Sequence, residues 1–172
     1  LRPPTTRPAG RATSEKRFSE PVRTVSGMIT NVSLVTVWVA DQDAAKAFYI
    51  DKLGFQERAD ITMGDGYRWC SVVHPDHPEL QLTLALPGPP LDDESAAAVR
   101  MMMDKGALHA VGLATDDCRK AFEELSARGV EFLQEPSDRP YGVEAMFRDN
   151  SGNYLVMVEE KPYTAGDFGP GA

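Results

Sequence analysis

The residues of this sequence best suited to chemistry are its three histidines. Two of them, His74 and His77, lie in the stretch "HPDHPE" together with Asp76 and Glu79. Nitrogen and carboxylate ligands at such short spacing can hold a first-row metal ion. The two prolines, however, predict an exposed turn with no support for a tetrahedral or open catalytic arrangement. We interpret the stretch as a solvated loop, with a metal site as the alternative.

The third histidine, His109, lies in "GALHAVGLATDDC", where a short apolar run leads into a helix. The run predicts a strand, and alternate side chains of a strand point to opposite faces. His109 then shares the face of Val111 and Leu113, which is suited to packing under a helix. A bulge or a one-residue slip would reverse this assignment. We expect a histidine at a strand end or at an interface and no metal ligand, unless such a slip is present.

The two cysteines and the acidic side chains offer less. Cys118 lies at a helix start, where the dipole can lower a thiol pKa, but no histidine is near it in sequence. Cys118 is therefore interpreted as a structural thiol and Cys70, in an apolar strand, as a core or cavity residue, and no catalytic residue is assigned. Glu144 and Glu159 are read as solvated carboxylates at strand ends. The absence of a disulfide framework favours a reducing, cytoplasmic setting.

Composition excludes several classes of function. The chain has 172 residues, of which 42% are hydrophobic and 26% charged, as in ordinary globular proteins. A net charge of −8 argues against a nucleic-acid-binding surface. No apolar run approaches the roughly 18 residues that a membrane span requires. We therefore expect neither a nucleic acid nor a membrane as partner.

The regular part of the chain begins near Asn31 and is built as two similar halves. In the first, the strand "SLVTVWVA" precedes a helix that Asp41 caps and Gly54 ends, and further strands such as "YRWCSVV" and "ELQLTLAL" follow. In the second, "HAVGLAT" precedes a helix that Asp116 or Asp117 caps, followed by "VEFLQEP", "GVEAMFRD" and "NYLVMVEE". The matching order predicts a duplicated βαβββ unit and an α+β fold.

This reading divides the chain into five segments. We expect a flexible, basic N-terminal extension over residues 1–27, a first βαβββ module over 28–90 and a linking helix over 91–105. A second module follows over 106–161 and a tail over 162–172.

Three stretches resemble the vicinal-oxygen-chelate superfamily of glyoxalases, bleomycin-resistance proteins and extradiol dioxygenases. They are "VADQDAAKAFYIDKLGF" (39–55), "TDDCRKAFEELSARGVEF" (115–132) and "RPYGVEAMFRDNSGNYLVMVE" (139–159). The resemblance implies a curled mixed sheet around a ligand cavity with the helices outside, and it implies a homodimer. It is much less specific for function, since the same scaffold hosts several chemistries.

The resemblance also places the metal ligands of the metal-dependent members, and here the sequence departs from them. The four positions fall on Leu34, Gln81, Ala110 and Val156. Three of these side chains cannot bind a metal ion. The chain is thus closest in character to the metal-free, bleomycin-resistance-like members, and we expect no cofactor.

Counting alternate residues along each strand from these four positions predicts a face lined by small, aromatic and hydrogen-bonding side chains. The expected ligand-binding residues are Leu34, Thr36, Trp38, Trp69, Gln81, Thr83, Ala110, Gly112, Tyr154 and Val156. We expect them to bind a small aromatic or planar antibiotic or metabolite, sequestering it without transforming it. One alternative is a face closed over a filled core. Another is a metal-dependent lyase or dioxygenase with a rearranged site, which needs Gln81 to converge with histidines or Glu159.

Overall fold

The computed structural model describes residues 29–169, and the helices and strands given below belong to one compact unit that begins at Val32. The expected extension over residues 1–27 lies outside the described residues. Within residues 29–169 no helix is long and apolar enough to cross a bilayer.

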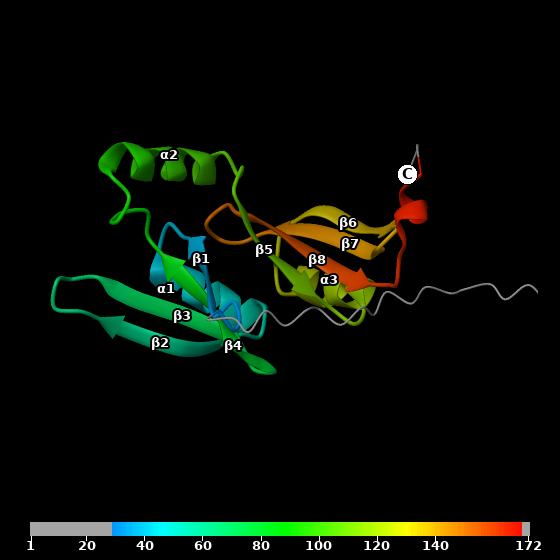
Figure 1. Cartoon of the computed structure of the whole chain (residues 1–172), viewed down its shortest axis with the longest axis horizontal. Helices are drawn as coiled ribbons and strands as arrows, with labels where there is room; N and C mark the ends of the chain where they lie inside the picture. Colours follow the sequence, from blue (N-terminus) through cyan, green and yellow to red (C-terminus); the bar gives the residue numbers. More distant parts are fainter. Residues whose placement is uncertain (1–28, 170–172) are drawn as a thin grey trace, which may run out of the picture. The chain divides into compact units, whose positions relative to one another are not determined.

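The first half of the chain forms a four-stranded sheet, called sheet A, with one helix. The strands lie in the order β1-β4-β3-β2, with β1 parallel to β4 and the other pairs antiparallel (Figure 1). Their bounds are β1 Leu34–Trp38, β2 Gln56–Thr62, β3 Arg68–His74 and β4 His77–Ala85, with α1 over Gln42–Ala47.

The second half repeats this plan in sheet B, whose strands lie in the order β5-β8-β7-β6 (Figure 1). Its elements are β5 His109–Ala114, α3 Cys118–Ala127, β6 Phe132–Arg139, β7 Gly142–Arg148 and β8 Tyr154–Glu160. The helix α2, Asp93–Asp104, links the two halves, and a short 3-10 helix, Ala165–Phe168, follows β8. The fold is therefore α+β with two mixed sheets of matching topology, as predicted.

Helix ends follow the capping residues that the sequence predicts. The Asp41 carboxylate accepts a hydrogen bond from the Ala44 N–H at 2.8 Å, and the Asp117 carboxylate accepts one from the Lys120 N–H at 2.9 Å. Asp117 rather than Asp116 is thus the cap of α3. The first helix differs from expectation because the stretch from Phe48 to Lys52 continues it as a π-helix.

The core lies between each sheet and its helix. Alternate residues of sheet A that face α1 are buried, among them Val37, Val72 and Leu84, and Tyr49 of the π-helix packs with them. Leu155 and Phe147 of sheet B belong to the same hydrophobic cluster. These residues fix which face of each sheet is covered by a helix and which is not.

A buried carboxylate ties the turn after β7 to the first half of the chain. Asp149 accepts hydrogen bonds from the backbone of Ser151 and Asn153 and from the Tyr49 hydroxyl, the last at 3.3 Å. Asn153 in turn donates to the Trp38 carbonyl at 2.8 Å. Burial raises the pKa of Asp149, and the hydrogen bonds oppose that rise. The turn thus fixes the end of β1, which carries part of the candidate site.

Candidate ligand-binding site

The face of sheet A that turns away from α1, here called distal face A, carries most of the predicted site. Register places its residues side by side on three adjacent strands, because Leu34, Thr36 and Trp38 pair with Gln81, Thr83 and Ala85, and Thr83 pairs with Ser71. Distal face A is lined by Leu34, Thr36, Trp38, Trp69, Ser71, Val73, Gln81, Thr83 and Ala85.

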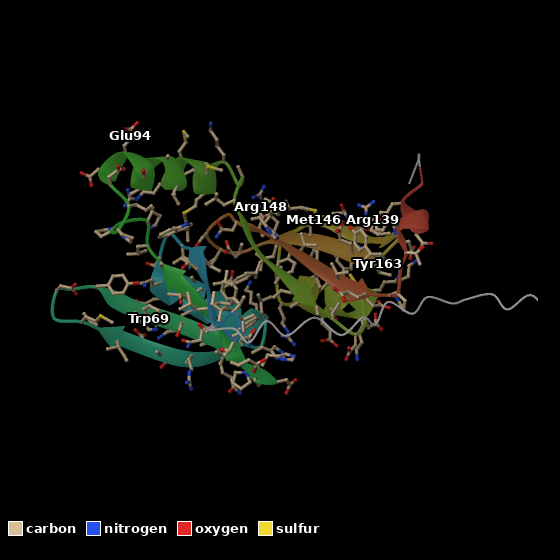
Figure 2. All side chains as sticks on the ribbon, in the orientation of Figure 1. Trp69, Glu94, Arg139, Met146, Arg148 and Tyr163 are labelled. Carbon is tan, nitrogen blue, oxygen red and sulfur yellow. The ribbon has the colours of Figure 1, made fainter. Side chains whose placement is uncertain are left out.

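Two aromatic rings lie on either side of a small residue on this face. Trp38 pairs with Ala85 on one side, and the antiparallel register of β3 and β4 places Trp69 on the other. Both indoles are half-buried, whereas Ala85 is buried. Trp69 is labelled on sheet A in Figure 2. Since Ala85 fills little of the space above its strand, the row offers apolar area to a flat guest.

The next row consists of hydroxyl groups. Thr36, Thr83 and Ser71 lie side by side on β1, β4 and β3. Thr36 is exposed, whereas Ser71 and Thr83 are buried. Ser71 donates a hydrogen bond to the Gln81 side-chain oxygen at 3.1 Å. The row thus supplies neutral hydrogen-bonding groups beside the aromatic row.

The sequence predicted Leu34, Thr36, Trp38, Trp69, Gln81 and Thr83 as site residues, and the structure brings these six together on distal face A. Ser71 was missed. The available signal was its spacing of two residues from Trp69, which gives both side chains the same face of a strand. A serine within an apolar strand is equally consistent with a position in the core.

The remaining predicted site residues belong to sheet B. Gly112 is exposed on β5, and its register partner Val156 and the nearby Tyr154 are half-buried on β8. They lie on the face opposite α3, here called distal face B, with His109, Ala114, Val158, Met146 and Glu144.

The predicted orientation of His109 is wrong. The ladder between β5 and β8 shifts between His109 and Gly112, so His109 pairs with Tyr154 and stacks on its ring with centroids 4.9 Å apart. This irregularity places His109 on distal face B. Ala110, expected to line the ligand face, instead packs against the hydrophobic core together with Val111.

Distal face B also carries a charged network that the sequence did not predict. Glu144 accepts hydrogen bonds from the Tyr141 hydroxyl at 2.6 Å and from Arg139 Nε at 3.4 Å, and Gln134 joins both side chains. The hydrogen bond to Glu144 raises the pKa of Tyr141. In Figure 2, Arg139 lies along the same side of sheet B as Met146. Glu144 is thus half-buried and paired, not the solvated strand-end carboxylate expected.

The other candidate groups for chemistry do not come together in one site. His74 and His77 pair across the β3–β4 hairpin, whose strands extend further into the predicted loop than expected. Glu159 accepts a hydrogen bond from the Cys118 N–H at 3.0 Å, and burial raises the pKa of the Cys118 thiol. Within residues 29–169 no three His, Cys, Asp or Glu side chains are grouped so that they could hold a metal ion.

With this geometry established, comparison with known proteins identifies the family. Residues 31–157 match the family described as the Glyoxalase/Bleomycin resistance protein/Dioxygenase superfamily. The chain belongs to this superfamily. It is 30% identical to the protein YurT of Bacillus subtilis (strain 168) over 129 residues, which are 75% of this chain and 98% of YurT.

Two solved structures share the fold. UcmS2 is 42% identical, with a TM-score of 0.72 over 77% of this chain and all of UcmS2. TnmS3, an antibiotic binding protein from Streptomyces sp. CB03234, is 30% identical, with a TM-score of 0.63 over 78% of this chain and 99% of its own. Membership of the superfamily fixes the fold, whereas the chemistry of distal face A must indicate the activity.

Proposed function

We propose that this protein binds and sequesters a small, planar, uncharged organic molecule on distal face A. The single observation that carries the proposal is the row Trp38–Ala85–Trp69, in which two half-buried indoles flank a buried alanine. Indole rings supply large apolar area at little entropic cost, and they favour stacking on flat guests. The likeness to TnmS3 supports an antibiotic or similar metabolite as the guest.

The charges of the first module support an uncharged guest. The ionised side chains of β2 and β3 that meet α1 neutralise one another, since Asp60 is held by Arg68 and Lys46. Hydrogen bonds from Arg68, and then from Lys46, hold the pKa of Asp60 well below its usual range. None of the nine residues named above as lining distal face A is ionisable. An ionic guest would lose hydration there without gaining a counter-charge.

The protein acts, in this proposal, without a metal ion or another cofactor, in the cytoplasm and as a homodimer. Leu34 and Ile61 are 41% and 57% exposed, although both are large apolar residues at the edge strands of sheet A. A second copy would cover such side chains and strand edges. Analytical ultracentrifugation is expected to give twice the chain mass of 18.8 kDa. A monomer at all concentrations contradicts this part of the proposal.

Intrinsic fluorescence tests the binding directly, because both tryptophans of the chain lie on distal face A. We choose fluorenone as probe, since it is planar, rigid and uncharged. Titration into metal-stripped protein is expected to quench or shift the emission in a saturable manner. N-acetyltryptophanamide under the same conditions corrects for collisional quenching and light absorption. A purely linear response equal to that of the free amide overturns the proposal.

A metal-dependent lyase or dioxygenase is the alternative that the sequence left open. The orientation of His109 on distal face B removes one objection to it. It still requires two further ligands, and Glu159 is occupied at the start of α3. Elemental analysis after purification without chelators decides between the two, because near-stoichiometric zinc, nickel, manganese or iron would favour the enzyme.

A further inference from the structure

Thr83 has the one buried side-chain oxygen or nitrogen within residues 29–169 that lacks a hydrogen-bond partner. Thr83 lies in the middle strand pair of sheet A and is 3% exposed. Its Oγ1 therefore has little access to solvent and none of its neighbours satisfies it. Buried hydroxyls almost always have a partner, since an unsatisfied one costs free energy. Such an atom on a candidate binding face calls for an explanation.

The polar neighbours of Thr83 on distal face A are Ser71 and Gln81, and neither makes a hydrogen bond with its hydroxyl. Ser71, its register partner on β3, uses its hydroxyl proton to donate to the Gln81 side-chain oxygen. This bond also orients the Gln81 amide. Its Nε2 makes no hydrogen bond with other described residues and is half-buried two positions before Thr83 on the same face. Two neutral donors, the Thr83 hydroxyl and the Gln81 amide, are thus available side by side.

The character of these donors limits what they can recognise. A hydroxyl and an amide N–H bind a neutral acceptor oxygen well, but they do not neutralise an anion. The adjacent row of Trp38 and Trp69 offers a stacking surface to the ring of a guest. The acceptor oxygen must therefore be attached to the edge of that ring. A carbonyl oxygen attached to a planar ring system meets both conditions.

We propose that Thr83 and Gln81 form a donor pair that selects uncharged planar guests with a carbonyl oxygen on the ring edge. The inference rests on the proposed binding function and adds the chemical class of the ligand. The free protein carries the cost of the unsatisfied Thr83 hydroxyl, so a carbonyl guest relieves that cost on binding. A guest without the oxygen gains only the stacking contribution.

Fluorenone and fluorene provide a matched pair of probes, because they differ by a carbonyl in place of a methylene group. Equilibrium dialysis of the full chain is expected to show fluorenone bound about 5 to 10 times more tightly than fluorene. In the variant Thr83→Val, which keeps the shape of the side chain, this ratio falls to between about one and two. The affinity for fluorene stays unchanged or rises slightly.

Three further variants make the test specific. Thr83→Ser keeps the hydroxyl and is expected to keep the ratio. Gln81→Met removes the amide donor at a half-buried position and should lower the ratio of the two affinities. It tests the donor pair even if the Thr83→Val variant does not fold. Thr62→Val removes an exposed hydroxyl from β2 that lies off distal face A, since Thr62 pairs with Arg68, and it should leave the ratio unchanged.

The apparent Tm gives an independent readout. Removing an unsatisfied buried hydroxyl is expected to raise the Tm of the Thr83→Val variant by a few degrees, although its binding of fluorenone weakens. If fluorenone and fluorene both bind and Thr83→Val leaves their ratio unchanged, the donor pair is disproved while the binding function stands. If neither probe binds the wild-type chain, the binding function itself fails.

Discussion

The two distal faces belong to modules of the same topology, yet their corresponding rows carry side chains of different chemical character. Where distal face A has Thr36, Thr83 and Ser71, the corresponding row of distal face B has Gly112, Val156 and Met146. Where distal face A has Trp38 and Ala85, distal face B has Ala114 and Val158, with Glu144 as the next neighbour. Equivalent backbone positions thus carry a neutral, hydrogen-bonding surface in one module and an aliphatic surface with a charged edge in the other.

The satisfaction of polar groups differs in the same way. On distal face B the Glu144 carboxylate has its partners in Arg139 and Tyr141, so its charge is already used within the protein. On distal face A the Thr83 hydroxyl has none. A saturated network contributes to the stability of the fold, whereas an unsaturated donor is available to a ligand. The comparison therefore supports the proposal that the first module binds the ligand, whereas the polar network of the second module stabilises the fold.

Loss of an indole gives the largest expected effect. Trp38→Ala removes one side of the aromatic row and should weaken fluorenone binding by about 30-fold, which corresponds to about 2 kcal/mol of stacking and apolar contact. Equilibrium dialysis measures it without relying on tryptophan emission. Circular dichroism establishes that the variant is folded.

Met146→Ala on distal face B is the matched control, since Met146 is half-buried, as Trp38 is. Its binding affinity should stay within about twofold of the wild type. An equal loss in both variants would mean that the two faces share the ligand, and the functional contrast between them would have to be abandoned.

The sequence was sufficient for the helix caps and for the faces of strands that pair without a shift. Asp41 and Asp117 cap helices because their short side chains accept hydrogen bonds from the first turn. Alternation along β1 and β4 correctly placed Trp38 and Thr83 on the ligand face. The buried Val37 and Leu84 lie on the opposite face. These strands pair without a shift along β1, so counting residues was enough to predict the face of each side chain.

The predictions failed where the orientation or partner of a side chain depends on how two strands pair, and not on the sequence of one strand. Counting back from Val111 places His109 toward the helix, but the shift in the β5–β8 ladder turns it toward Tyr154. Gly112, an isolated glycine within the strand, is a sign of such a shift, but it does not give the new register. Likewise, the partnership of Arg139 with Glu144 depends on how β6 lies on β7, where the register shifts again. Sequence alone therefore could not recognise Glu144 as a paired carboxylate.

A smaller effect is expected from neutralising that carboxylate. Glu144→Gln leaves Arg139 without its counter-charge and weakens the bond from Tyr141, so unfolding should require about 1–2 kcal/mol less. For a chain of this size the Tm falls by about 3–6 °C. Fluorenone binding should change little, because the network has no role on distal face A.

The pH dependence identifies the source of that loss. Glu144 raises the pKa of Tyr141, so the folded state holds the phenolic proton more tightly than the unfolded chain. This stabilisation is complete below the unfolded pKa of about 10 and is lost as the pH rises through the folded value. The difference in the free energy of unfolding between wild type and Glu144→Gln should therefore become smaller at alkaline pH. Absorbance titration at 295 nm should show one phenol that ionises at a lower pH in the variant. Tyr141→Phe provides the control, since it abolishes that phenol. A difference in stability that persists unchanged above pH 11 would assign the effect to Arg139 alone.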